Sequence, residues 1–376
     1  MSHAPGSYPV SLLDYELPRE LIAQQPLAER DASRLLAVSR AQATIMHRSF
    51  RELPELLPSE SFLVLNDSRV MRCRYICTRK ASGGRAEVLL TRVFADATAE
   101  CLTEARGHLQ PGERLAFRDG VEFEVLRPTG SEEPGLVRIL LGNARPADRE
   151  LREILTSGEL PLPPYLREEL ADPERYQTSF AEPLGSSAAP TAGLHFSERT
   201  FADLARRGIE HTCITLHIGS ATFLPIRGLE AARHRLAPEP YFIFPALFQR
   251  ILAAKLAGRP IVAVGTTVIR ALEWVFRDWR AVCRELGLFT PEEVAALPLR
   301  SLAGRFPLSG ETALYILPGY RFRFVDALIT NFHLPRTTLL ALVYAFGGRD
   351  LIRRAYSEAV ALRYRFYSLG DSMLIQ

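Results

Sequence analysis

Two kinds of hydrophobic pattern follow one another along the chain, and the place where they change limits the folds it can adopt. Between residues 70 and 150 the apolar residues come in short runs with turn signals such as Pro111-Gly112 between them. The runs are Ala86–Leu90, Leu115–Phe117, Val121–Val125 and Val137–Leu141. Short strands at regular spacing, separated by glycine and proline, are typical of a small antiparallel barrel or sandwich. We therefore predict an inserted all-β barrel domain at residues 70–150.

On either side of that stretch, at residues 1–69 and 151–376, strand-like segments alternate with helical ones. Buried strands are expected at Leu35–Val38, Phe62–Leu65, His211–Ile218, Pro260–Gly265 and Asp326–Thr330. Helical patterns cover 246–257, 267–282 and 334–346, whereas residues 156–192 are rich in proline and irregular. This alternation predicts a barrel-like α/β domain, here discontinuous in sequence and larger than the inserted one.

Composition excludes several classes of protein. The chain of 376 residues is 47% hydrophobic and 24% charged, which is ordinary for a globular protein with sizeable cores. Its longest apolar runs are too short to span a bilayer, and its first residues lack the pattern of a signal peptide. We therefore expect a cytoplasmic protein that does not contact membranes. The five cysteines are scattered without the spacing of a metal clip, so we expect reduced thiols and no metal site.

Basic residues gather at the start of the predicted barrel. Arg69, Arg72 and Arg74 open a stretch to residue 85 that contains further basic residues and no acid, although the net charge of the chain is only +3. Such a patch, with Tyr75 beside it, suits a nucleic-acid backbone. The alternative is a solvated strand face without a ligand.

The segment Gly185–Phe196 is turn-rich within an otherwise apolar region. It contains two glycines, a proline, a threonine and the histidine His195. Backbone amides and one titratable ring could face a ligand there, because glycine and proline prevent regular structure. His217 and His333 lie in apolar strand-like settings, where a histidine is more often a buried structural ring than a proton donor or acceptor.

Two strand ends carry further polar groups. Gly265, Thr266 and Thr267 follow a buried strand and open a helix, so one of the threonines could cap it and the helix N-terminus could bind an anion. A plain capped turn is the alternative. Asn66 and Asp67 end another buried strand, where either a ligand contact or an Asx-turn would explain them.

Together these residues carry a resemblance to one family. The strings APTAGLHF at Ala189–Phe196 and LITNFHLP at Leu328–Pro335 are long and chemically unusual. With the other matching segments they resemble the S-adenosylmethionine:tRNA ribosyltransferase-isomerase family of queuosine biosynthesis, in order from about residue 10 to the C-terminus. The other segments are Tyr15–Pro18, Arg30–Leu35, Asn66–Val70, Arg175–Thr178, Thr215–Gly219, Val264–Thr267 and Tyr364–Asp371.

The resemblance implies an α/β fold with a small inserted β-barrel, and a reaction. The ribosyl group of the co-substrate S-adenosylmethionine passes to a 7-aminomethyl-7-deazaguanine base at the wobble position of tRNA, giving epoxyqueuosine, adenine and methionine. We expect tRNA as the partner, a monomer, and no metal.

The resemblance also assigns candidate roles to residues. The candidates for the base are His195 and His217, with His333 and Asp67 as orienting or acid groups. The candidates for binding S-adenosylmethionine are Thr191, Gly193, Phe196, Gly265, Thr266, Thr267 and Asn331. The candidates for binding tRNA phosphates are Arg69, Arg72, Arg74, Arg175 and Arg336.

The chain departs from the family pattern at two places. His234 and Glu239 keep their register, but Ala237 stands where the family usually has a second histidine, and Ala221 stands where it usually has glycine. These departures leave two alternatives open: a tRNA-binding homologue without catalysis, or an enzyme of the same fold that acts on a different nucleoside.

Overall fold

The computed structural model describes residues 7–94, 96–128, 136–141, 148–163, 165–168, 170–219, 226, 228–299, 301 and 305–376. The chain forms two compact units. One comprises Met1–Ser68, Pro164–Pro183 and Ala189–Gln376, and the other comprises Arg69–Pro163 and Leu184–Ala188. Position 221, one of the two departures from the family pattern, lies outside the described residues.

The larger unit is built on a nine-stranded mixed sheet with the strand order β15-β13-β12-β3-β14-β16-β17-β1-β2. Its four central strands β12, β3, β14 and β16 are parallel to one another. Strands β3, β14 and β16 are buried along their whole length, as strands covered on both faces should be. The strands are β1 Arg34–Ser39, β2 Thr44–Ser49, β3 Phe62–Asn66, β12 Glu210–Leu216, β13 Glu239–Phe242, β14 Ile261–Val264, β15 Ser309–Thr312, β16 Ala327–Asn331 and β17 Ser372–Ile375.

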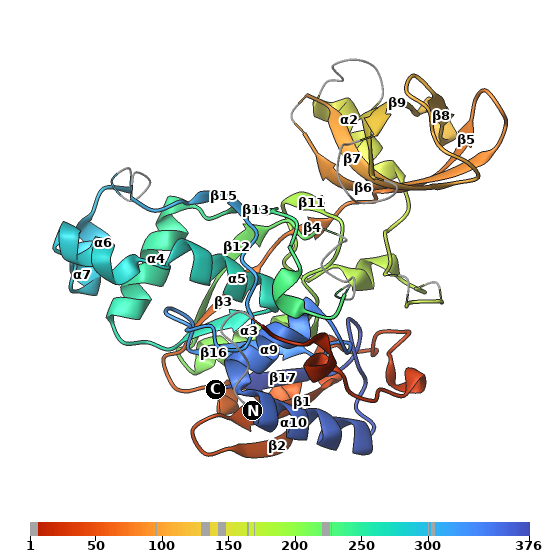
Figure 1. Ribbon diagram of the computed structural model, residues 1–376. Helices are drawn as coiled ribbons and strands as arrows, with labels where there is room; N and C mark the ends of the chain where they lie inside the picture. Colours follow the sequence, from red (N-terminus) through yellow and green to blue (C-terminus); the bar gives the residue numbers. More distant parts are fainter. Residues whose placement is uncertain are drawn as a thin grey trace. The chain divides into compact units, whose positions relative to one another are not determined.

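Helices connect and cover these strands (Figure 1). They are α1 Leu53–Leu56, α3 Glu198–Arg206, α4 Pro245–Leu256, α5 Thr266–Val275, α6 Trp279–Leu286, α7 Pro291–Ala296, α9 Thr338–Gly347 and α10 Arg349–Ala361. The prediction of one helix over 267–282 is wrong, because α5 ends before α6 begins. Phe276, at the break, stacks between Phe248 at 4.6 Å and Phe324 at 3.8 Å between ring centroids. Tertiary packing of this kind leaves no glycine or proline signal in the sequence.

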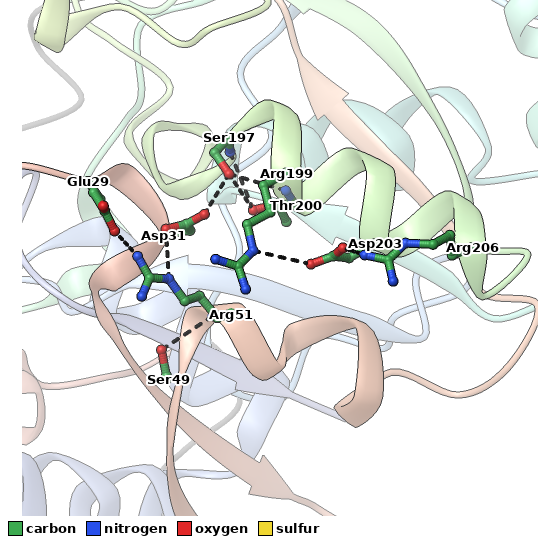
Figure 2. Close-up of polar contacts among 9 residues, drawn as sticks. All are labelled: Glu29, Asp31, Ser49, Arg51, Ser197, Arg199, Thr200, Asp203 and Arg206. Carbon is green, nitrogen blue, oxygen red and sulfur yellow. Dashed lines mark hydrogen bonds and ion pairs between the residues drawn. The ribbon is translucent and has the colours of Figure 1, made fainter.

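Short 3₁₀ helices fill several connections. They are η1 Val10–Leu13, η2 Arg19–Leu21, η3 Arg30–Ala32, η4 Phe50–Glu52, η6 Pro173–Tyr176, η7 Thr191–His195 and η9 Ala231–Arg233. Two of them, η6 and η7, lie in the region of residues 156–196 that the sequence predicts to be irregular. Figure 2 shows how η3 is joined to the beginning of α3: Asp31 accepts a hydrogen bond from the Ser197 hydroxyl at 2.7 Å and also pairs with Arg51. Ser197 is at the same time the N-cap of α3.

The smaller unit contains a closed antiparallel barrel with the strand order β10-β7-β6-β5-β8-β9 (orange and yellow in Figure 1). Its strands are β5 Arg74–Arg79, β6 Arg85–Val93, β7 Thr98–Ala105, β8 Arg114–Ala116, β9 Glu122–Pro128 and β10 Leu136–Leu141. Tyr75 packs edge-on against Phe117 and Phe123 in the core. The predicted α/β class with a small all-β barrel is therefore confirmed.

Three further elements complete the smaller unit. The helix α2 Asp148–Ser157 contributes Ile154 and Leu155 to its core, and the short strands β4 Arg69–Val70 and β11 Leu184–Ser186 pair in parallel. All five cysteines are free. Among the described residues, none of the helices is long and apolar enough to cross a membrane, and no group of three histidine, cysteine or acidic residues could hold a metal ion.

Candidate functional site

The carboxyl ends of the four parallel strands bring the candidate residues to one edge of the sheet. β3 ends at Asn66, β12 is followed by His217, β14 by Gly265, and β16 ends at Asn331. Ligands of open α/β sheets bind at this edge, because the loops that leave it diverge and expose backbone and side-chain polar groups. The strand β17 begins at the same edge, since Ser372 is paired with Asn331.

A cavity of about 440 Å³ lies at this edge. Three segments supply most of its walls: 189–192 from η7 and the residues before it, 265–267 from the start of α5, and the end of β16 with the residues after it, from which Thr330, Asn331 and His333 line the cavity. Tyr367 and Ser368, just before β17, complete it together with Ile218 and Leu339. Of the predicted S-adenosylmethionine ligands, Thr191, Gly265, Thr266, Thr267 and Asn331 line this cavity.

Gly193 and Phe196 support the cavity wall from behind. A Cβ atom on Gly193 would lie 2.9 Å from Thr178 Cγ2 and 3.0 Å from Phe180 Cζ, so no side chain fits at this turn of η7. Phe196 is fully buried and packs edge-on against Phe50, 5.1 Å away. Neither residue lines the cavity, so the unusual string APTAGLHF combines wall residues with packing residues.

His195 is buried and both of its ring nitrogens are engaged. Nδ1 lies 2.8 Å from the Ser33 hydroxyl, and Nε2 lies 3.2 Å from Nδ2 of Asn331. The same Asn331 Nδ2 also donates to the carbonyl of Tyr367, an obligate acceptor, so this atom is the amide nitrogen. Nε2 of His195 must then accept, and the ring carries its proton on Nδ1. Burial, with the charges of Arg365 and Arg30, lowers the pKa of His195 to about 3.

The side-chain oxygen of Asn331 has no hydrogen-bond donor within the described part of the chain. Its Oδ1 atom is buried and has no hydrogen-bond partner among the described residues, while the residue itself lines the cavity. A buried acceptor without a donor costs free energy, and functional sites are where such groups are retained. Asn331 thus offers a fixed acceptor to a bound ligand, and His195 and Tyr367 hold the amide in place.

His333 also lines the cavity, and its Nε2 atom lies 2.8 Å from the hydroxyl of Thr330. Its backbone amide donates to the hydroxyl of Tyr356 at 3.0 Å. Burial lowers the pKa of His333 to about 3, so this ring is neutral at physiological pH.

His217 and Asp67 form a second polar group at the same edge, outside the residues that line the cavity. Nδ1 of His217 lies 2.7 Å from the hydroxyl of Ser68, and Asp67 accepts a hydrogen bond from Thr215 at 2.7 Å. Burial lowers the pKa of His217 and raises the pKa of Asp67. Asn66 forms the expected Asx-turn by accepting from the amide of Ser68.

The start of α5 differs from the prediction that a threonine would cap it. Gly265 is the N-cap, with φ of 103°, and no side chain caps the helix. The first amides of α5 therefore face the cavity without a side-chain acceptor, because Gly265, Thr266 and Thr267 line it.

Comparison with known proteins shows which family the chain resembles. The family model of queuosine biosynthesis proteins matches residues 10–375. The S-adenosylmethionine:tRNA ribosyltransferase-isomerase of Symbiobacterium thermophilum is 45% identical over 367 residues, which cover 97% of this chain and 99% of the relative. The enzyme of that name from Xanthomonas euvesicatoria is 44% identical, over 96% of this chain and 95% of the relative.

The chain belongs to the S-adenosylmethionine:tRNA ribosyltransferase-isomerase family. A crystal structure described as an S-adenosylmethionine tRNA ribosyltransferase from Thermotoga maritima is also similar, with 31% identity and a TM-score of 0.51. It aligns over 97% of this chain and 100% of that chain. The family resemblance inferred from the motifs is confirmed, and so is membership of a family of transferases.

The departure of this ribosyltransferase-isomerase homologue at Ala237 lies away from the cavity. Ala237 is exposed, on the segment before β13. Glu239, which keeps the family register, is buried in an ion pair with Arg270 and accepts from the amide of Gly219 at 3.1 Å. The neighbourhood of the missing histidine therefore serves the packing of β13 against α5, and it contributes no cavity wall.

The predicted tRNA-binding arginines fall into different surroundings. Arg74 makes a two-pronged ion pair with Glu87, at 2.7 and 2.9 Å, and Arg336 pairs with Asp14. Arg72 is exposed, and Arg69 lies in β4. Arg175 instead lines a second cavity of about 320 Å³, which shares Ser368 with the first cavity and is also lined by His195.

Sequence reasoning missed several residues that line these two cavities, among them Arg30, Ser33, Tyr367 and Ser368. All four lie within motifs that carry the family resemblance, Arg30–Leu35 and Tyr364–Asp371. Their positions in those motifs could have indicated that they belong to the site.

Proposed function

We propose that this protein transfers the ribosyl group of S-adenosylmethionine to the 7-aminomethyl-7-deazaguanine base at the wobble position of tRNA. The ribose is isomerised to the epoxycyclopentane of epoxyqueuosine, and adenine and methionine leave. The observation that carries the proposal is the 440 Å³ cavity, walled by the two most specific family strings at the carboxyl edge of the sheet.

In this proposal the catalytic α/β domain, which the sequence analysis expects at residues 1–69 and 151–376, binds S-adenosylmethionine in that cavity. The uncapped start of α5 receives the methionine carboxylate, because free helix amides and the helix dipole attract anions. The Oδ1 atom of Asn331 accepts a hydrogen bond from an amino or hydroxyl group of the adenosine. The ring of Tyr367 borders the cavity, and an aromatic face stabilises a sulfonium by about 0.5–2 kcal/mol.

We propose His217 as the base that starts the reaction. The sulfonium acidifies the protons on the adjacent 5′ carbon; one C–H bond breaks, its electron pair stays on carbon as an ylide, and the proton goes to the imidazole. The lowered pKa of His217 keeps the ring unprotonated and able to accept a proton at neutral pH. Its neighbour Ile218 lines the cavity. His195 serves to position Asn331, since both of its nitrogens are engaged.

The test is to incubate the purified protein with S-adenosylmethionine and tRNA that carries the deazaguanine precursor. Release of one adenine per modified nucleoside, with mass analysis showing epoxyqueuosine at the wobble position, is the expected result. The matched control is the same tRNA with an unmodified guanine. Tight tRNA binding without adenine release would favour a non-catalytic homologue. Adenine release that needs no tRNA and depends weakly on salt would favour another nucleoside substrate.

We also propose that the protein acts as a monomer in the cytoplasm, where its tRNA partner is found, and without a metal. Sedimentation should then give a species of 42.1 kDa, the mass of one chain. Activity should be unchanged after treatment with a chelator. A dimer whose dissociation abolishes activity, or a loss of activity that a divalent metal restores, would contradict this part of the proposal.

A further inference from the structure

At the second cavity, Arg30 and Arg175 each donate hydrogen bonds to backbone carbonyls near the other arginine. Arg175 donates to the carbonyls of Leu27 and Ala28 at 2.7 and 2.9 Å, just before Arg30 in sequence. Arg30 in turn donates to the carbonyl of Glu174 at 3.4 Å, next to Arg175, and to that of Leu194 at 3.3 Å. Both guanidinium groups border the cavity of about 320 Å³. The fold therefore fixes two like charges side by side.

In the described part of the chain, no carboxylate forms an ion pair with either arginine, although the charge of Asp172 acts on Arg30. Among the described residues, neither Arg30 nor Arg175 has an acidic group within ion-pair distance, and the Nε atom of Arg175 is buried without a hydrogen-bond partner. The two acids next to Arg30 in sequence, Glu29 and Asp31, are both turned to Arg51, as Figure 2 shows. Burial and the charge of Arg175 lower the pKa of Arg30, and the smaller opposing effect of Asp172 does not reverse this shift.

A third guanidinium adds to the positive potential. Arg365 donates to the carbonyl of Gln25, the residue before the cavity-lining Pro26, and its Nη1 atom is buried without a hydrogen-bond partner among the described residues. Its nearest acid, Asp371, is bound by the side chain of Arg34 and by backbone amides. Arg365 and Arg30 both act on the pKa of His195, which borders the same cavity.

Half-buried cations without counter-charge destabilise a folded protein unless a ligand compensates them. Guanidinium groups match a tetrahedral oxyanion well, because their N–H groups bind two of its oxygens at once. We infer that Arg30 and Arg175, with Arg365 beside them, form an oxyanion subsite that binds a phosphodiester group of the tRNA substrate. The inference rests on the proposed function for the identity of the tRNA.

The arginine subsite adjoins the first cavity, as a site for a phosphate of the tRNA substrate should. His195 borders the arginine cavity, Asn331 borders the other one, and the two side chains are hydrogen-bonded. A phosphate held by the arginines would fix the nucleotide chain next to the cavity that we propose for S-adenosylmethionine. The methionine carboxylate is the other oxyanion that the reaction offers, and the experiment separates the two sources.

The first arm uses the protein alone with inorganic phosphate as the probe, at constant ionic strength against chloride. The variants are Arg30→Gln, Arg175→Gln and Arg30→Lys. The control is Arg40→Gln, since Arg40 also donates to backbone carbonyls, those of Phe346 and Asp326, but lines neither cavity. Phosphate should raise the melting temperature of the wild type and of the control, and it should have little effect on the two glutamine variants. Equal stabilisation of all variants overturns the subsite.

The second arm measures the affinities for tRNA and for S-adenosylmethionine separately. For Arg30→Gln and Arg175→Gln we expect tRNA binding about tenfold weaker or more, with a salt slope reduced by about one. Arg30→Lys should bind with intermediate affinity, and S-adenosylmethionine affinity should stay within about twofold. Weakened S-adenosylmethionine binding with unchanged tRNA binding would assign the arginines to the carboxylate and overturn the phosphodiester assignment.

Failure of the proposed function would give a different experimental result from failure of the arginine subsite. Wild-type protein that releases no adenine, yet shows the arginine-dependent binding of phosphate and tRNA, would refute the catalytic proposal and leave the subsite intact. A variant that no longer folds is recognised by its circular dichroism, in which case Arg30→Lys, which keeps the charge and removes the planar fork, decides the outcome.

Discussion

The arginines of the barrel and the arginines beside the cavities have opposite surroundings. In the barrel, Arg74 faces Glu87 on the neighbouring strand, and Arg79 pairs with Glu113. At the second cavity, Arg30 and Arg175 reach backbone carbonyls and face each other. Cross-strand ion pairs stabilise a sheet and consume the charge that a ligand would need. The difference teaches that a basic run in the sequence is a weaker sign of a nucleic-acid contact than a basic residue left unpaired by the fold.

Buried polar groups of the barrel and of the first cavity also differ in whether they have a partner within the protein. The hydroxyl of Tyr75, in the barrel core, donates to the carbonyl of Ile154 at 2.7 Å. At the first cavity, the Oδ1 atom of Asn331 has no partner among the described residues. The barrel is therefore satisfied by its own residues, whereas the edge of the α/β sheet retains groups that a ligand can satisfy.

The largest effect is expected for His217, the proposed base. His217→Gln should lower kcat by about 100-fold or more, because general bases typically contribute 10²–10⁴-fold. The wild-type rate should fall as the pH drops below the pKa of His217, which burial moves down from 6.5. That acid limb should be absent from His217→Gln. It should persist in His195→Gln, because the pKa of His195 is about 3. A pH profile of kcat that keeps its limb in His217→Gln would contradict the assignment.

A second test compares the unsatisfied and the satisfied polar group directly. Asn331→Ala should lower kcat/KM by roughly 10–100-fold, since a ligand donor then loses its acceptor. The barrel variant Tyr75→Phe should leave kcat/KM unchanged and lower the free energy of unfolding by about 1 kcal/mol. Steady-state kinetics and urea unfolding of both variants give the comparison. Equal kinetic effects of the two substitutions would remove the distinction between the regions.

The fold class followed from the sequence because two hydrophobic periods are distinct along the chain. The runs at 86–90, 115–117 and 137–141 lie in β6, β8 and β10, and the buried runs ending at Asn66 and Val264 are parallel strands of the larger sheet. The order of these strands could not be predicted, because it depends on contacts between segments far apart. The end of α5 was missed for the same reason, since Phe276 is placed by rings of other elements.

Several residues that line the cavity could be singled out from the sequence, whereas their arrangement could not. Thr191, Gly265 and Asn331 do meet at one cavity, as the family motifs implied. The sequence could not tell that Phe196 is a packing residue, nor that the barrel arginines face acids on neighbouring strands. Those facts depend on burial and on strand register. The pair of Arg30 and Arg175 is 145 positions apart in the chain and becomes visible only in the folded protein.

The buried neutral histidines should make the α/β unit sensitive to acid. His195 and His333 have pKa values of about 3 when folded, against about 6.5 when unfolded, so the unfolded chain binds more protons between these values. Stability is therefore complete above pH 6.5 and falls as the pH drops toward 3. Between these pH values, each ring lowers the free energy of unfolding by up to about 1.4 kcal/mol for each unit by which the pH falls. Urea unfolding at pH 7, 6 and 5 should show a shallower pH dependence for His195→Gln than for the wild type.

The smallest effect is expected for Arg74→Gln in the barrel. This variant tests whether an arginine that is paired within the protein contributes to tRNA binding. Arg74 and Glu87 are partly exposed, with side chains 38% and 24% accessible, so solvent screens their interaction. Arg74→Gln should lower the free energy of unfolding by about 0.5 kcal/mol and change tRNA affinity by less than about twofold, because the Glu87 carboxylate already occupies the guanidinium. Glu87→Gln, which leaves Arg74 only its longer ion pair with Glu159 at 3.5 Å, is the matched variant. A loss of tRNA affinity in Arg74→Gln equal to that in Arg175→Gln would mean that the ion pair opens for the nucleic acid, and that pairing in the unbound protein does not separate structural arginines from tRNA-binding ones.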